Sequence, residues 1–256
     1  MAFDSYSGYE QQPVFEQKSP VSSVGKALGR SYLYMGIALL VTALVAFVVG
    51  YGMTYWMTTS SSAAPFYVLM GAIIVSFIGM VIISFTMVKR LNSSGKSLWP
   101  GFIAYSVLMG ICLSSFIIAG IDFLVVGEAF GISALAFLSV GLIGYFSKKD
   151  LNRLWLWVGV FSMVVLLTAI VAPLMFFFYF SSSAYLIYDL IMSVVILVMV
   201  LVVSAIDSYN IKKILEAGQG GTNIELYCAF SMYSDFIAIF VRVLYLLLIL
   251  GARRSD

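Results

Sequence analysis

The stretch IELYCAFSMYSDFIAIFVRVLYLLLIL, residues 224–250, decides the architecture of this chain. It is long and apolar enough to cross a bilayer, because a helix rises about 1.5 Å per residue and the hydrocarbon layer is about 30 Å thick. Asp235 and Arg242 lie inside it, and their spacing of seven residues places them on one helical face. Ionisable groups at that depth are costly unless they face protein, water or an opposite charge. We therefore predict that this helix is central in a bundle and carries functional groups.

The composition of the whole chain is that of a multi-pass membrane protein. Of its 256 residues, 62% are hydrophobic and only 10% are charged. Ordinary soluble domains have about 45–50% apolar and about 25% charged residues. The fold class that we predict is therefore all-α, with a lipid bilayer as the principal partner. The basic residues are scattered among the connecting segments, so no nucleic-acid partner is expected.

The chain contains no histidine, which excludes His-based triads, the zincin helix and imidazole proton relays. No Ser/Lys or metal arrangement replaces them, so we expect neither an enzyme nor a bound cofactor. Cys112 and Cys228 both lie inside apolar segments and read as small buried hydrophobes, not as a disulfide or metal pair.

Seven apolar segments follow a polar N-terminal tail. The tail, residues 1–29, has no signal-peptide pattern and is predicted to be disordered; residues 30–252 form the transmembrane domain. A Ser/Thr-rich connector covers residues 54–65, a basic loop holds Lys89, Arg90 and Lys96, and a further loop holds Asp122 and Glu128. The predicted spans are residues 32–51, 66–88, 98–118, 130–146, 154–176, 185–206 and 224–250.

The distribution of positive charge predicts the orientation. Eleven of the 14 basic residues lie in the N-terminal segment and after the second, fourth and sixth spans. Basic connecting segments stay in the cytoplasm, so we expect a cytoplasmic N-terminus, in the plasma membrane of a bacterium to judge by the short loops. Seven full crossings would then leave Arg253 and Arg254 outside, which the same rule disfavours. A crossing and a re-entrant last segment both remain open.

Two aspartates enter the membrane from the same side. Asp207 lies five residues before Lys212, near the end of the sixth span, and Asp235 lies one to two turns deeper in the antiparallel seventh. Two carboxyls in one low-dielectric pocket cannot both ionise cheaply, so we expect the pair to share a proton and titrate together. Hard oxygen ligands suit Ca²⁺, and two carboxylates alone would form a weak site. The alternative is that each aspartate only bonds a neighbouring backbone group.

Other charged residues are candidate partners of this pair or of a cation on its way to it. Arg242, Arg90 and Lys89 are possible basic partners, and each would favour the ionised carboxylate. Asp189, at the outer start of the sixth span, reads first as an interfacial residue. Asp122 and Glu128 read first as solvated loop residues; the alternative is that these two gather cations at an outer mouth.

Small residues in the third and fourth spans predict close helix packing. A specific ligand role is the weaker reading. The residues are Gly110, Ser114, Ser115, Ser139, Gly141 and Gly144.

Several segments resemble the Bax-inhibitor (transmembrane Bax inhibitor motif) family. FIAYSVLMGICLSSF (102–116) is similar to its third helix, and ISALAFLSVGLIG followed by YFSKKDLNRLW (132–155) to its fourth helix and the loop after it. GRSYLYMGIALLVTALVAFVVG (29–50) resembles its opening. SAIDSYNIKKI (204–214) and SMYSDFIAIFVRVLYLLLILG (231–251) resemble the segments that carry its paired aspartates. The order and spacing of these segments, over residues 27–251, make the resemblance specific.

The resemblance implies a seven-helix fold with the last helix central and a pH-sensitive calcium leak. Asp207 and Asp235 match the family's two aspartates, and Lys89 and Arg90 fall near a basic residue that pairs with them in bacterial relatives. This chain departs from the pattern at Ala238, where asparagine is usual, and its basic residue Arg242 comes early.

The leading hypothesis is therefore a calcium leak channel or transporter gated by protonation of the aspartate pair. The second hypothesis, from a different class, is a regulatory membrane protein that binds a membrane protease or a stress-response partner, as some bacterial relatives do.

Overall fold

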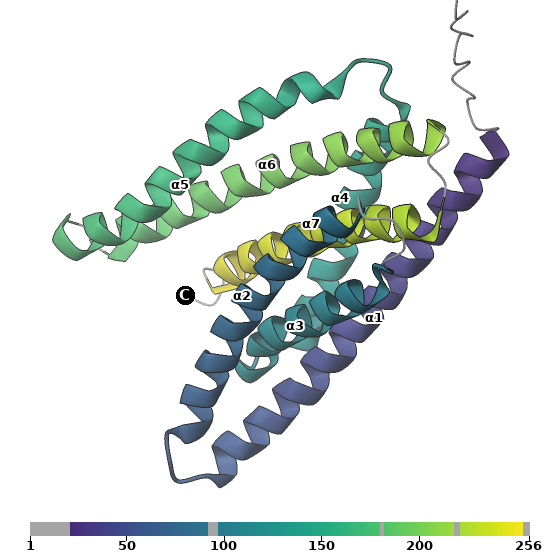
Figure 1. Ribbon diagram of the computed structural model, residues 1–256. Helices are drawn as coiled ribbons and strands as arrows, with labels where there is room; N and C mark the ends of the chain where they lie inside the picture. Colours follow the sequence, from purple (N-terminus) through teal and green to yellow (C-terminus); the bar gives the residue numbers. More distant parts are fainter. Residues whose placement is uncertain (1–20, 92–96, 180–181, 218–220, 253–256) are drawn as a thin grey trace, which may run out of the picture.

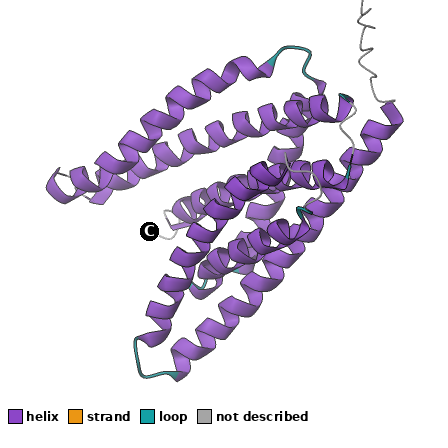
Figure 2. Cartoon of the chain, viewed as in Figure 1, coloured by secondary structure: helices purple, strands orange, loops and turns teal. Residues whose placement is uncertain are grey.

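The computed structural model describes residues 21–91, 97–179, 182–217 and 221–252. In these ranges the chain forms helices joined by short connections, and it contains no strand (Figure 2). The helices are α1 Val21–Thr59, α2 Ala64–Leu91, α3 Trp99–Ile118, α4 Phe123–Phe146, the short η1 Leu151–Arg153, α5 Leu154–Tyr179, α6 Ser182–Glu216 and α7 Thr222–Ala252 (Figure 1).

Seven of the described helices are long and apolar enough to cross a membrane. The polar backbone explains this architecture, because a helix satisfies its own N–H and C=O groups where no water is available. The predicted all-α class with seven spans is confirmed. The protein is an integral multi-pass membrane protein.

Two predicted loops are largely helical. Glu128 was expected in a loop, but α4 begins at Phe123, and the Asp122 side chain caps it by accepting a bond from the Leu124 amide at 3.1 Å. Asp122 is an effective N-cap because its carboxylate satisfies an amide that has no partner within the helix. Lys89 and Arg90 were expected in a basic loop and instead lie in the last turn of α2.

The first helix is longer at both ends than the sequence indicated. Residues 21–29, assigned to the tail, belong to α1, and residues 1–20 lie outside the described residues. Residues 54–59 of the expected connector also continue α1, so only four residues separate it from α2. Thr54, Thr58 and Thr59 return their hydroxyls to backbone carbonyls of the same helix, which lets polar residues extend it.

Helix α7 is central, as expected (Figure 1). It packs against α1, α4 and α6 along much of its length and touches α2 and α3, while α5 packs mainly on α6 at the edge. Its buried side chains form the middle of the core: Leu226, Cys228, Ala229, Tyr233, Ile239 and Leu244 are fully buried.

Glycine allows the closest approaches between helices. A Cβ on Gly144 would lie 2.2 Å from the Ala205 carbonyl oxygen of α6, and one on Gly110 would lie 2.8 Å from the Thr42 carbonyl oxygen of α1. The close-packing interpretation is confirmed for these two glycines. It is wrong for Ser139, which is exposed and bonds only its own helix.

Candidate functional site

The candidate site lies between α6 and α7, near the turn that joins them. The two helices run antiparallel, so positions before the turn on α6 face positions after it on α7. Serines at 231 and 234, next to Asp235, give α7 a short polar face in an otherwise apolar helix. This polar face positions hydroxyl and carboxyl groups against the end of α6.

Asp207 is bound across this interface. Its Oδ2 accepts a hydrogen bond from the Ser231 hydroxyl at 2.9 Å. The Tyr227 ring, one turn earlier on α7, is also within electrostatic reach of the carboxyl. Asp207 therefore does more than bond a neighbouring backbone group, because its partner comes from the facing helix.

Asp235 is buried one turn after Ser231, with 8% of its surface exposed. Its carboxyl interacts electrostatically with Asp207, and the fully buried Ser204 hydroxyl of α6 lies near it, outside hydrogen-bonding geometry. The two carboxyls therefore influence each other electrostatically across the α6–α7 interface. A shared proton between Asp207 and Asp235 stays a prediction.

The basic candidates lie on α2 and α7. Lys89 and Arg90 are exposed in the last turn of α2, and Arg242 is half-buried two turns beyond Asp235. The ion pairs seen in the described ranges include Arg30 with Glu225, Lys212 with Glu216 and Lys213 with Asp150. Pairing of the basic candidates with the aspartates stays a prediction.

The outer acidic candidates lie at the starts of α6 and α4. Asp189, near the start of α6, accepts a hydrogen bond from the Tyr245 hydroxyl and so joins α6 to α7 a second time, at the far end of their interface. Asp122 caps α4, and Glu128 is exposed on that helix. In the part of the chain that the structure describes, no three acidic or cysteine side chains are grouped closely enough to hold a metal ion.

The sequence analysis missed Glu225, which is 5% exposed at the start of α7. Its Oε1 lies 3.3 Å from Arg30 Nη1, and its carbonyl oxygen accepts a bond from the Ser31 hydroxyl at 3.0 Å. These contacts join the first and last helices at the same end of the bundle as Asp207. An acidic residue in the first turn of a helix was the available signal, since it complements the helix dipole.

The site can hold a proton or a weakly bound cation. Its ligating atoms are all oxygens, from the two carboxyls and the nearby hydroxyls of Ser204 and Ser231. Such ligands suit hard cations, and two carboxylates are too few for tight binding. Loss of a proton would leave negative charge in a low-dielectric interface, where it is stabilised only by hydroxyls or by an arriving cation.

Comparison with known proteins agrees with the architecture. The family model described as "Inhibitor of apoptosis-promoting Bax1" matches residues 24–255. An uncharacterized protein of Borreliella burgdorferi is 29% identical over 250 residues, an alignment that covers 94% of this chain and 98% of that protein. The matched region contains all seven long helices and both aspartates of the candidate site. The chain belongs to this Bax-inhibitor family of membrane proteins.

Proposed function

We propose that this protein is a cation leak pathway, with Ca²⁺ as the expected permeant ion, regulated by protonation of Asp207 and Asp235. The observation that supports this most directly is the hydrogen bond from Ser231 of α7 to Asp207 of the facing helix α6, with the buried Asp235 one turn further along α7. A purely structural role would be served more cheaply by apolar residues, because buried ionisable groups are costly in a bilayer.

The sign of the pH dependence follows from the charge of the pair. At low pH both carboxyls are protonated, and the neutral interface offers little attraction to a divalent cation. As the pH rises, at least one carboxylate forms and two negative groups begin to repel each other across α6 and α7. Cation flux should therefore increase with pH.

A path along α6 and α7 would continue towards the opposite end of their interface. Arg242 lies on the same face of α7 as Asp235, and Asp189 with Tyr245 lies beyond it. A fixed positive charge on this path would slow divalent cations, which is consistent with a slow leak and not with a fast channel.

The test is Ca²⁺ flux into liposomes that contain the purified protein, measured with an internal indicator across a pH series. Asp207→Asn and Asp235→Asn should abolish most of the pH response, because an amide cannot lose a proton. Asp150→Asn is the matched control, since Asp150 lies in an exposed connection and pairs with Lys213. Equal flux and equal pH response in all four proteins would refute the proposal.

A regulatory role is the second candidate, and the family's description as an inhibitor of apoptosis-promoting Bax1 favours it. That description names inhibitors of another protein, which is a binding function. In this chain the corresponding partner would be a membrane protease or a stress-response protein. Deletion of residues 1–20, ahead of α1, should then remove a co-purifying partner and leave flux unchanged; co-purification that survives the deletion would count against a tail-mediated interaction.

A further inference from the structure

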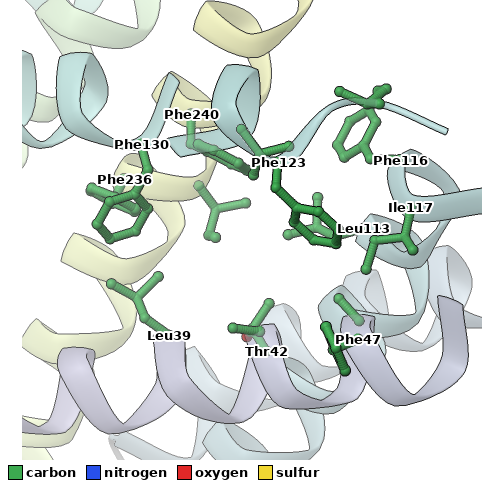
Figure 3. A pocket seen from close by; sticks show the side chains of 15 residues that line it. Leu39, Thr42, Phe47, Leu113, Phe116, Ile117, Phe123, Phe130, Phe236 and Phe240 are labelled. Atoms are coloured by element: carbon green, nitrogen blue, oxygen red, sulfur yellow. The ribbon is translucent and has the colours of Figure 1, made fainter. Parts of the chain in front are cut away.

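An apolar cavity lies between α1, α3, α4 and α7 (Figure 3). Its volume is about 250 Å³. Its floor is formed by α7, where Phe236, Ile237 and Phe240 are buried. The remaining lining comes from three segments and the turn before α4: Leu39, Thr42, Ala43, Ala46 and Phe47 of α1, Leu113, Phe116 and Ile117 of α3, Ile121, and Phe123, Val126 and Phe130 of α4.

The cavity is a slot that aromatic rings close at one end. Where α3 turns into α4, the Phe123 ring lies 6.5 Å from the Phe47 ring and 6.4 Å from the Tyr51 ring. From this end the slot follows α1 for about 12 Å, at about 1.5 Å per residue from Phe47 back to Leu39.

The long side of the slot opens outward, away from the core. Phe47, Phe123 and Phe130, which form its rim, are each about half exposed, at 51%, 54% and 48%. All three belong to membrane-spanning helices, so their exposed faces meet the hydrocarbon layer. The open side of the slot is therefore in contact with lipid acyl chains and not with water.

The lining excludes polar occupants. Thr42 is its only polar side chain, and its hydroxyl already contacts the Ala38 carbonyl, the Ser106 carbonyl and the Tyr233 hydroxyl. Water needs two to four polar partners to occupy a cavity, and apolar cavities of about 150 Å³ stay dry and take up small hydrocarbons. An empty slot would also forfeit dispersion contacts along all of its walls.

One charged group lies at the closed end of the slot. Asp122 stands between the lining residues Ile121 and Phe123 and is exposed. Its Oδ1 caps α4, and the exposed carboxylate lies next in sequence to two lining residues of the slot. This charge complements an ammonium group and repels an anionic headgroup.

We propose that this slot is a lipid-binding site that holds one acyl chain of an aminophospholipid, with its ammonium group near Asp122. The acyl chain forms no hydrogen bond with the lining. It is held by packing against the phenylalanine rings. This site is separate from the aspartate pair and does not depend on the proposed leak.

The test uses the full-length protein in lipid nanodiscs containing phosphatidylethanolamine with a diazirine at the end of one acyl chain. After photolysis, labelled peptides are mapped by mass spectrometry. Labelling should concentrate on the slot-lining positions of α1, α3 and α4. Ala43→Phe, which fills the slot, should remove this labelling, whereas Leu44→Phe, on the outward face of the same helix, should leave it unchanged.

A second pair of variants keeps the test valid if Ala43→Phe fails to fold. Val126→Phe fills the slot from α4, and Leu124→Phe, which is 67% exposed before substitution, is its control. Labelling spread evenly over outward-facing residues and unaffected by either filling variant would overturn the proposal. Cross-links to a second copy of the chain at the slot, in place of lipid, would also overturn it.

A separate experiment tests the headgroup assignment. Phosphatidylglycerol with the same diazirine chain should label the slot more weakly than phosphatidylethanolamine, and Asp122→Asn should remove the difference while keeping an effective helix cap. Equal labelling by the two lipids in the unmodified protein would overturn the ammonium assignment.

Discussion

Ser231 and Ser234 stand three residues apart on α7 and differ in what their hydroxyls do. Ser231 donates to Asp207, whereas the buried Ser234 hydroxyl has no hydrogen-bond partner. Substituting each serine in turn therefore distinguishes the effect of a hydrogen bond across the α6–α7 interface from the effect of a serine that lies nearby without such a bond.

Ser231→Ala should lower the free energy of unfolding by about 0.6 kcal/mol, the average for a hydrogen bond between membrane helices. Ser234→Ala should cost nothing or stabilise slightly, because it removes a buried hydroxyl with no bond to lose. Denaturation in mixed detergent micelles, followed by far-ultraviolet circular dichroism, measures both. An equal loss in the two variants would show that the Ser231 bond contributes little.

Tyr245 and Asp189 connect the same two helices at the other end of their interface. Tyr245→Phe should let α6 and α7 separate there, because a phenyl ring cannot donate to the carboxyl. Spin labels on the exposed positions Val194 and Leu250 should then report a broader distance distribution.

Tyr188→Phe is the matched control for this separation. The Tyr188 hydroxyl donates to the Thr168 carbonyl oxygen and so joins α6 to α5, not to α7. An unchanged distance distribution for Tyr245→Phe, or an equal broadening in the control, would argue against a connection at that end.

At the scale of helices, glycine decides how closely α4 and α6 approach. Gly144→Ala would place a methyl group 2.2 Å from the Ala205 carbonyl oxygen, which belongs to backbone and cannot rotate away. We expect a destabilisation of about 1–3 kcal/mol, typical of overpacking. Because Ala205 lies two residues before Asp207, the variant should also change the pH dependence of flux.

Gly141→Ala is the control on the same helix. Its added methyl group would meet the Ser208 hydroxyl oxygen at 3.6 Å, an ordinary contact. Thermal unfolding in detergent should therefore distinguish Gly144→Ala from Gly141→Ala. Identical unfolding temperatures would mean that α6 moves aside without cost.

For the whole molecule, the open question is its orientation in the membrane. The basic segments predict that the connection from α4 to α5 lies in the cytoplasm and that the connection from α1 to α2 lies outside. In intact cells a membrane-impermeant maleimide should react with Ser61→Cys and should reach Ser147→Cys only after permeabilisation.

The two native cysteines should not react with the maleimide. Cys112 is partly buried and Cys228 is fully buried, and both belong to spanning helices. Labelling of Ser147→Cys in intact cells, with Ser61→Cys protected, would reverse the predicted topology.

The fold class of this protein, its seven spans and its central last helix were all predictable from the amino-acid sequence. The fold class and the spans depend on apolar length, which is summed over many residues. The central position of the last helix follows from the free-energy cost of exposing Asp235 and Arg242 to lipid. Helix ends were less predictable: Asp122 caps α4, and Thr54, Thr58 and Thr59 bond their own helix, so α4 begins earlier and α1 ends later than hydropathy indicates.

The contacts of each polar group depend on tertiary packing. The bond from Ser231 to Asp207 requires particular faces of α6 and α7 to pack together, which the sequence alone did not predict. The ion pair of Arg30 with Glu225 and the apolar slot depend on α1 returning to helices far along the chain. Local sequence cannot specify such contacts, because helix rotation and crossing are set by packing among all the neighbours at once.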